Sequence, residues 1–328
     1  MTRNCYVEQP ASDHFDGLRF FNPGQSQPDR TLGDVLRWQA AGGRAQWPTL
    51  VPVTQAVPEQ RCDKLRVTMV GHATTLIQFR SCNILTDPVW SERASPLPFA
   101  GPRRVTAPGI ALERLPAIDY VLLSHNHYDH LDLQTLAKLH SGHCPTIITP
   151  LGNDTIIRSR VPNARIKVGD WNDRIDLGDG FRVTIVPANH WSARGTRDRR
   201  MALWSGFIVA HRQTSLYFAG DTGYCGGAIF RAIRERYGAP TFALLPIGAY
   251  EPRWFMAPQH VNPAEAVQIM KDVGAQRALG IHWGTFRLTN EARNAPKVAL
   301  QAALKEQGIS LTAFQAGEPG SVYDVEDG

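Results

Sequence analysis

The chain contains the stretch Ser124-His125-Asn126-His127-Tyr128-Asp129-His130-Leu131-Asp132, in which three imidazoles and the Asp129 carboxylate share one short turn. The apolar run at residues 118–123 predicts a buried strand before the turn, and the apolar spacing of residues 133–139 predicts a helix after it. Four such ligands would saturate one metal ion and leave no open position for chemistry. Two ions about 3.5–4 Å apart would divide them and share ligands from elsewhere in the chain. The alternative is a polar loop with incidental histidines.

This His-x-His-x-Asp-His turn is the signature of the metallo-β-lactamase superfamily, which the chain resembles. The superfamily also places a distal His, a bridging Asp and a last His at strand ends. The sequence offers these as His190 after residues 181–186, Asp221 after residues 215–219, and His282 after residues 277–281. The resemblance implies an α/β fold, the four-layer αβ/βα sandwich of that superfamily.

The composition allows a soluble enzyme with an anionic partner. The 328 residues are 43% hydrophobic and can bury one large core or two modest ones. Residues 1–17 hold no apolar run of signal-peptide length, and five cysteines without a CxxC pair predict neither a disulfide framework nor a thiolate site. The chain is therefore expected to be cytoplasmic, with peripheral membrane contact left open. A net charge of +5 suits nucleic acid, phospholipid headgroups or a phosphorylated substrate, but it is also common in ordinary enzymes.

The pattern of the chain predicts two parts. Residues 1–63 are predicted to form an N-terminal extension wrapped on the main domain, because their aromatic side chains need burial. A short helix is expected at residues 31–41 with Thr31 as its N-cap. A disordered tail is the alternative for this extension. Residues 64–328 are predicted to form the catalytic domain of metallo-β-lactamase fold.

Further segments resemble one branch of the superfamily, the N-acylphosphatidylethanolamine-hydrolysing phospholipase D family. The most specific is Pro246-Ile247-Gly248-Ala249-Tyr250-Glu251-Pro252-Arg253-Trp254-Phe255-Met256, followed by Gln259-His260-Val261. The resemblance implies two zinc ions, one held by His125, His127 and His190 and the other by Asp129, His130 and His282, with Asp221 bridging them. Imidazole and carboxylate ligands also accept iron or manganese.

Four residues are catalytic candidates. Asp129 and Asp221 would serve catalysis as metal ligands, and two further residues, Asp87 and His260, would have supporting roles. By resemblance, Asp87 lies beneath the metals and orients their ligands; the alternative is a turn residue before proline. His260 would donate a proton or a hydrogen bond to the substrate phosphate, or else serve as a structural residue at a helix start. His72 matches no ligand position and is expected to be structural or to face the substrate.

The resemblance implies hydrolysis of an N-acylphosphatidylethanolamine-type phospholipid to phosphatidic acid and an N-acylethanolamine. A metal-dependent lactonase or sugar-phosphate lactonase is the alternative enzyme, and a lipid-binding relative with a vestigial site is the alternative without catalysis. No nucleic acid partner is expected, and an oligomer is compatible with the sequence. A phospholipid substrate favours a membrane-docking edge, predicted to comprise Trp90, Leu97, Phe99, Trp254, Phe255 and Met256, backed by Arg194, Arg197, Arg199 and Arg200.

Overall fold

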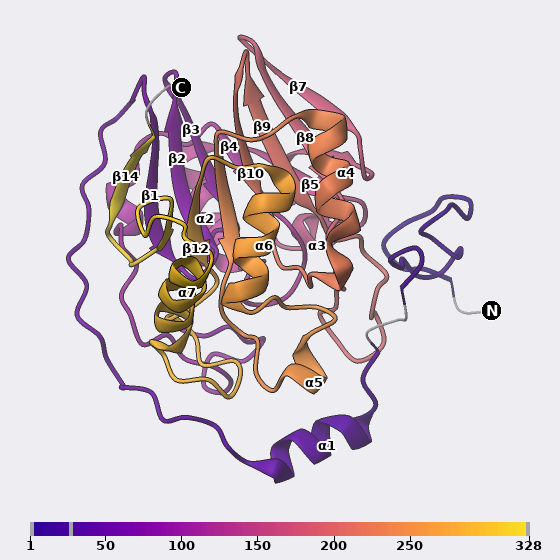
Figure 1. Ribbon diagram of the computed structural model, residues 1–328. Coiled ribbons are helices and arrows are strands. Elements are labelled where there is room, and N and C mark those ends of the chain that lie inside the picture. The colour runs from indigo at the N-terminus through magenta and orange to yellow at the C-terminus, as the bar shows by residue number, and fades with distance from the viewer. Residues whose placement is uncertain (1–2, 26–28, 326–328) are drawn as a thin grey trace.

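The computed structural model describes residues 3–25 and 29–325, and two seven-stranded sheets dominate it (Figure 1). The first sheet has the strand order β14-β1-β2-β3-β4-β5-β6. Strands β14 to β3 pair antiparallel, whereas β3 to β6 run parallel. Its strands are β1 (Leu65–Gly71), β2 (Thr74–Phe79), β3 (Cys82–Thr86), β4 (Tyr120–Leu122), β5 (Thr146–Pro150), β6 (Arg165–Gly169) and β14 (Val322–Val325).

The second sheet repeats this mixed plan with the order β13-β12-β11-β10-β9-β8-β7. Strands β13 to β10 run parallel, and β10 to β7 pair antiparallel. Its strands are β7 (Arg174–Gly178), β8 (Phe181–Val186), β9 (Gly206–His211), β10 (Thr214–Phe218), β11 (Phe242–Pro246), β12 (Arg277–Ile281) and β13 (Phe314–Ala316).

Helices cover the outer faces of both sheets and complete four layers. α2 packs on the first sheet together with α3, while α4, α6 and α7 pack on the second. α1 and α5 lie together at one end of the molecule (Figure 1). The α-helices are α1 (Leu32–Ala41), α2 (Leu133–His143), α3 (Asn153–Arg158), α4 (Ala228–Tyr237), α5 (Arg253–Met256), α6 (Pro263–Val273) and α7 (Ala295–Glu306), and short 3₁₀ turns lie at Leu112–Arg114 and Cys225–Gly227.

The alternation of side chains along each strand builds these layers. In β10, Leu216 and Phe218 face the core between the sheets, whereas Tyr217 faces the helices. In β4, Leu122 joins the core between the sheets and Val121 packs under α2. Central strands buried on both faces read as continuous apolar runs, which is why the sequence predicted them well. The predicted four-layer αβ/βα sandwich is confirmed.

The predicted elements agree closely with the observed ones, with three omissions. The sequence carries no clear signal for β7, β14 or α5. The two strands lie at sheet edges and expose alternate side chains, so they lack the apolar run of a central strand. The single-turn α5 is too short to carry a helical period.

The N-terminal segment runs along the outside of the sandwich before it enters β1 (Figure 1). The expected helix is present as α1, and Thr31 caps it in a capping box with Asp34. Phe15 and Phe20 are fully buried against Leu203 and Trp204 of the main body. Phe21, Trp38 and Trp47 are half-buried, and the division at residue 63 stays a prediction. In the described ranges, no helix is both long and apolar enough to cross a membrane.

His14 anchors this segment through charge. Its Nδ1 lies 2.5 Å from Asp13 Oδ1, and its Nε2 lies 2.8 Å from Asp170 Oδ1, in the turn between β6 and β7. Burial lowers the pKa of His14, but the hydrogen bonds to Asp170 and Asp13 outweigh it and raise the pKa above its usual value. The pair therefore stabilises the fold fully below the unfolded pKa of about 6.5, and this contribution is lost as pH rises through the folded pKa.

We expect His14→Gln to remove this pH dependence. The free energy of unfolding of the unmodified chain should fall as pH rises above about 6.5, and the variant should lose stability mainly at low pH, where the imidazolium is charged. Denaturant titrations at a series of pH values measure the free energy of unfolding of the unmodified chain and of the variant. Asp170→Asn should also lower the stability at low pH. An identical pH profile for the unmodified chain and the variant would contradict the anchoring role of His14.

Candidate metal centre

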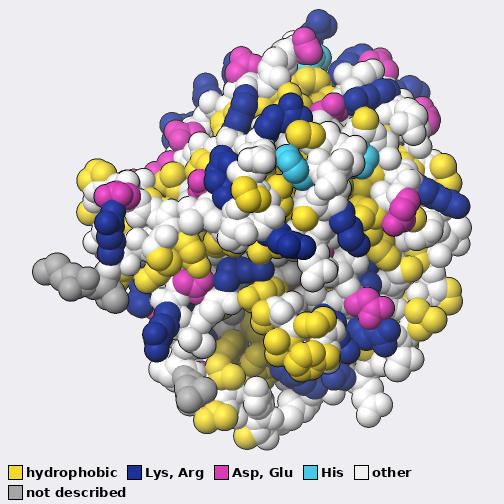
Figure 2. All heavy atoms as spheres, turned by 180° about the vertical axis from the view of Figure 1, so that it is seen from behind, with side chains coloured by type: hydrophobic (Ala, Val, Ile, Leu, Met, Phe, Trp, Pro, Cys, Tyr) yellow, Lys and Arg dark blue, Asp and Glu magenta, His cyan; other side chains and the backbone are white. Residues whose placement is uncertain are grey.

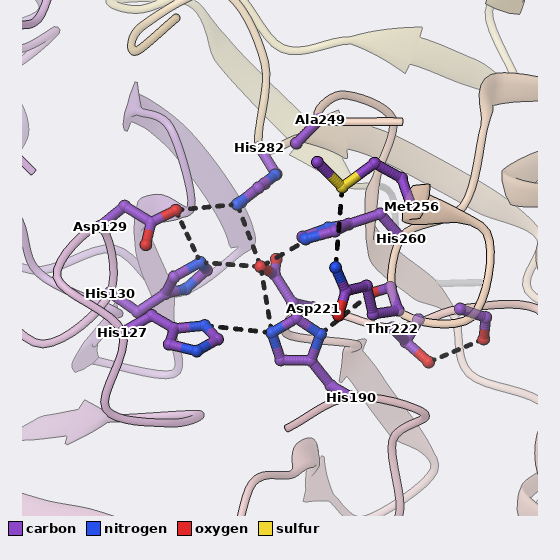
Figure 3. Close-up of polar contacts among 12 residues, drawn as sticks. His127, Asp129, His130, His190, Asp221, Thr222, Ala249, Met256, His260 and His282 are labelled. Atoms are coloured by element: carbon purple, nitrogen blue, oxygen red, sulfur yellow. Dashed lines mark hydrogen bonds and ion pairs between the residues drawn. The ribbon is translucent and has the colours of Figure 1, made fainter. Parts of the chain in front are cut away.

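Seven candidate ligands from both sheets meet at the ends of strands. The turn after β4 carries four of them, and the segments after β8, β10 and β12 carry one each. In open α/β sheets, ligands bind outside the carboxyl ends of strands, and this convergence follows that rule. Figure 3 shows the Asp221 carboxylate at the centre of the group, with imidazoles on several sides. The structure thus brings together all seven residues, namely His125, His127, Asp129, His130, His190, Asp221 and His282.

Three imidazoles form the first cluster. His125 Nε2 lies 2.9 Å from His127 Nδ1, and His190 Nε2 lies 3.2 Å from the same Nδ1. The three nitrogens therefore face one point from three directions. Asp221 Oδ2 lies 3.7 Å from His190 Nε2 and is the nearest carboxylate oxygen to this nitrogen in the described structure.

The second cluster lies on the other side of Asp221. Its Oδ2 lies 3.2 Å from His130 Nε2 and 3.1 Å from His282 Nε2. Asp129 Oδ2 completes the group, 3.5 Å from His130 Nε2 and 3.2 Å from His282 Nε2. Asp221 is 3% exposed and lies between the two clusters, so that one carboxylate serves both.

The donor set fits a metal ion on two observations. Ligands about 2.0–2.2 Å from a tetrahedral ion lie roughly 3.3–3.6 Å apart, and most of the distances within the clusters are close to this spacing. His130 Nε2 and Asp221 Oδ1 are also buried with no hydrogen-bond partner among the described residues. Buried polar atoms rarely remain unpaired, so a bound ion explains both. The cluster is therefore suited to binding metal.

Outer residues hold the imidazoles through their second nitrogens. Ser124 Oγ lies 2.9 Å from His125 Nδ1, and the Gln259 carbonyl oxygen lies 3.0 Å from His190 Nδ1. Asp87 Oδ2 lies 2.6 Å from His130 Nδ1. Such partners fix the tautomer and orientation of a ligating His.

Asp87 lies beneath the cluster, at the end of β3, and is fully buried. Its carboxylate accepts hydrogen bonds from the backbone N–H of Ser124 at 2.7 Å and from the Ser124 hydroxyl at 2.6 Å. It thus contacts both His130 and the residue that supports His125. Asp87 could be identified from the sequence, whereas Ser124 carries no signal beyond its place beside the turn.

Three of the candidate ligands have the protonation states that bind metal. Burial lowers the pKa of His127 to about 4, and burial with neighbouring imidazoles holds the pKa of His125 well below its usual value. Burial alone would raise the pKa of Asp221, but His130 and His282 outweigh it and hold this pKa well below its usual range. These groups are thus neutral imidazoles and an ionised carboxylate.

His130 and His282 show the opposite shift. Burial lowers the pKa of His282, but Asp221 and Asp129 outweigh it and raise the pKa to about 9. The pKa of His130 is likewise raised well above its usual value by Asp221, Asp129 and Asp87 against the effect of burial. A metal ion at these nitrogens would displace the protons that the carboxylates otherwise retain.

Two more histidines contact the cluster. His260, between α5 and α6, places Nδ1 3.8 Å from Asp221 Oδ2. Burial and His282 lower its pKa to about 4 against the effect of Asp221, so its imidazole is neutral. His72, in the turn between β1 and β2, places Nε2 2.9 Å from Asp129 Oδ2. From the sequence it was expected to be structural or to face the substrate, because it matches no ligand position of the superfamily.

The arginines after His190 contact the protein itself, which corrects the predicted basic edge. Arg194 lies 3.7 Å above the Tyr128 ring and donates to the backbone carbonyls of Asn126 and Leu131. Arg199 stacks at 3.7 Å on Trp191, a ring that also contacts His127. Arg200 is buried and pairs with an acidic partner in the N-terminal segment. Three of the four arginines are thus used for internal packing.

The aromatic part of the predicted edge also needs correction. Phe255 and Met256 are only 7% and 6% exposed, because α5 turns them inward and Phe255 packs on Trp38 of α1. Trp254 is 42% exposed, and Leu97 and Phe99 in the loop before β4 are 45% and 76% exposed. The exposed apolar residues of the predicted edge are therefore Leu97, Phe99 and Trp254, while Trp90 is half-buried.

Two consecutive N-terminal residues connect the two sides of the cluster. Asp29 accepts hydrogen bonds from Arg199 at 2.7 Å and from Arg200 at 2.8 Å, in the loop after His190. Arg30 donates to the backbone carbonyls of α5, at 2.7 Å to Trp254 and 3.0 Å to Phe255. The extension therefore contacts both the loop after β8 and the helix that precedes His260.

The chain is similar to known proteins in both sequence and fold. Residues 82–283 match the model of the beta-lactamase superfamily domain. The chain is 36% identical over 274 residues to N-acyl-phosphatidylethanolamine-hydrolyzing phospholipase D 1 of Caenorhabditis elegans, which spans 80% of this chain and 76% of the worm protein. It is 35% identical over 260 residues to the mitochondrial N-acyl-phosphatidylethanolamine-hydrolyzing phospholipase D of Saccharomyces cerevisiae, which spans 76% of this chain and 54% of the yeast protein.

Among solved structures, the metallo hydrolase Igni18 of Ignicoccus hospitalis has a TM-score of 0.60 at 21% identity, over 81% of this chain and 100% of that one. This similarity is one of fold. With the strand-end cluster of His and Asp, the match over residues 82–283 defines the chain as a metal-dependent hydrolase of the beta-lactamase superfamily. More narrowly, the chain belongs to the N-acylphosphatidylethanolamine-hydrolysing phospholipase D family. The predicted family is thus confirmed.

We expect Asp87→Asn to weaken metal binding, because the amide removes the charge that holds His130 and disturbs the bonds from Ser124. Loss of such an outer partner lowers metal affinity about 10–100-fold. Competition with a chelator, read by elemental analysis, measures the affinity. Asp119→Asn is the matched control, since Asp119 precedes β4 at the opposite end of the strand and pairs with Arg61. Equal affinity in the Asp87 variant and the unmodified chain would contradict the role.

Proposed function

We propose that this chain is a dinuclear zinc phosphodiesterase that hydrolyses N-acylphosphatidylethanolamine-type phospholipids to phosphatidic acid and N-acylethanolamine. The observation that carries the proposal is the 36% identity to the worm phospholipase D, which extends over 80% of the chain. The segment from Pro246 to Met256 supports it, because it continues into His260 beside the cluster.

The two clusters supply the ligands for this reaction. His125, His127 and His190 would hold one zinc, and Asp129, His130 and His282 the other. Asp221, which faces both clusters, would bridge them. Two bound zinc ions supply Lewis acidity toward the phosphate oxygens and lower the pKa of water toward about 7. Iron or manganese would fit the same nitrogen and oxygen donors.

The chain itself positions the substrate phosphate. His260 lies 3.8 Å from the shared carboxylate and is not one of the seven predicted ligands, and its buried Nδ1 has no hydrogen-bond partner within the described residues. Because the pKa of His260 is about 4, a neutral imidazole would donate a hydrogen bond to a phosphate oxygen and would not act as an imidazolium acid at neutral pH. Trp191 packs beside His127 and narrows the space around the first cluster.

The position of bond cleavage tests the proposal. Hydrolysis of N-palmitoylphosphatidylethanolamine in ¹⁸O-labelled water should place the label in phosphatidic acid, as measured by mass spectrometry, since attack occurs at phosphorus. Asp221→Asn is the control for contaminating activity and should lose turnover. Label in the released N-acylethanolamine, or turnover confined to a panel of lactones, would overturn the assignment.

We further propose that the enzyme meets its substrate at a membrane surface. A phospholipid leaves its bilayer at a cost of about 0.8 kcal/mol for each exposed CH₂, so the enzyme gains by binding the surface. Leu97, Phe99 and Trp254 offer exposed apolar side chains. A cavity of about 690 Å³ lies beside Leu97 and is lined by both Tyr128 and Lys138. In Figure 2, apolar side chains gather near the lower end of the molecule with Lys and Arg beside them.

Replacing Phe99 and Trp254 by Ser should reduce co-sedimentation with phospholipid vesicles. Each inserted aromatic side chain contributes about 1.5–3 kcal/mol, so each change should lower the vesicle affinity about tenfold or more. Turnover of a soluble diester should stay close to that of the unmodified chain. Val298→Ser on α7 is the control, because Val298 is also an exposed apolar residue, at 63%, between the values of Trp254 and Phe99. Unchanged vesicle binding would show that the substrate arrives by another route.

A further inference from the structure

His72 joins two candidate ligands that belong to different sheets. Its side chain reaches Asp129, in the turn after β4 of the first sheet, with Nε2 2.9 Å from Asp129 Oδ2. Its backbone carbonyl accepts a hydrogen bond of 2.7 Å from the N–H of His282, at the end of β12 in the second sheet. Its ring lies 4.1 Å from the His282 ring. One residue thus contacts both members of the second cluster that flank His130.

The hydrogen bond to Asp129 defines the tautomer of His72. A carboxylate only accepts, so the proton lies on Nε2 and Nδ1 carries a lone pair. In the described structure, Nδ1 is buried without a partner, and the ring is 1% exposed.

The backbone of His72 is held in an unfavourable conformation. Its φ of 55° lies in the left-handed region, where glycine is preferred and a side chain costs free energy. The N–H of His72 donates to Thr285 Oγ1 at 3.0 Å, which helps to hold this turn against the segment after His282. A glycine would relax the backbone here, so the contacts of the imidazole must offset the cost.

His72 acts beside the second cluster and is not one of its ligands. The nitrogens within 4 Å of Asp221 Oδ2 in the described structure belong to His130, His190, His260 and His282. His72 Nε2 lies in the same group of possible ligand atoms as Asp129, His130 and His282, but among the described residues its ion pair is with Asp129 alone and it is not among the nitrogens close to the bridging Asp221.

We propose that His72 is a positioning residue that sets Asp129 and His282 at the spacing the second metal requires, through the Nε2–H bond to Asp129 and the carbonyl bond from His282. This inference rests on the proposed dinuclear site. Its direct consequence is selective: His72 contacts no member of the His125–His127–His190 cluster among its hydrogen bonds and ion pairs in residues 3–25 and 29–325. Loss of the imidazole should therefore weaken one of two metals.

Zinc binding to His72 variants tests this. We expect about two zinc ions per unmodified chain, and His72→Leu should release one of them about 10–100-fold more readily to a chelator while it retains the other. His72→Gln keeps an N–H donor of similar reach and should restore most of the affinity. His72→Gly removes the side chain without backbone strain, so it should remain folded and lose the same zinc. Elemental analysis and chelator-release kinetics measure these effects without reference to turnover.

His211→Leu is the matched control, since His211 lies at the end of β9 opposite the cluster and packs on Phe181. It should retain both zinc ions. Equal zinc release from His72→Leu, His72→Gln and the unmodified chain would overturn the positioning role while the dinuclear site stands. Fewer than two zinc ions in the unmodified chain would instead overturn the dinuclear site, and the role of His72 with it.

Discussion

A single buried carboxylate, that of Asp221, sets the main constraint on this structure. An ionised carboxylate that is 3% exposed is strongly unfavourable unless positive or polar groups surround it. Its Oδ2 faces imidazoles from the turn after β4, from the segments after β8 and β12, and from the segment between α5 and α6. The two sheets must therefore stack in register at one end, because no single sheet supplies all of these groups.

The local sequence was sufficient to predict the central strands and the turn that carries four candidate ligands. The apolar runs of β4, β10 and β12 and the four candidate ligands in the turn after β4 could be read directly, whereas His190, Asp221 and His282 came from the resemblance to the superfamily. What the sequence could not show was pairing between distant segments. The bond between His72 and Asp129 joins residues 57 positions apart, and the edge strand β14 pairs with β1 from the other end of the chain. Neither has a period or motif of its own.

The loop after His190 illustrates a second limit. Four arginines in seven residues indicate a cationic surface when only charge is counted. In the structure, Arg194 and Arg199 lie over the rings of Tyr128 and Trp191, and Asp29 pairs with Arg199 and Arg200. A guanidinium plane packs on aromatic rings and also forms hydrogen bonds at its edge, so arginine often serves as an internal packing residue. Net charge cannot separate that use from recognition of an anion.

The contacts of Asp29 and Arg30 bear on how this family can diversify. Asp29 contacts the loop after β8 and Arg30 contacts α5, so a short stretch of the extension links two segments that adjoin the metal-ligand cluster. None of the seven candidate ligands lies in that stretch. Substitutions around Asp29 and Arg30 would therefore shift the loop after β8 and α5 relative to one another without replacing a candidate ligand. The N-terminal extension is thus a part of the chain where the surroundings of the cluster can change while the ligand set is retained.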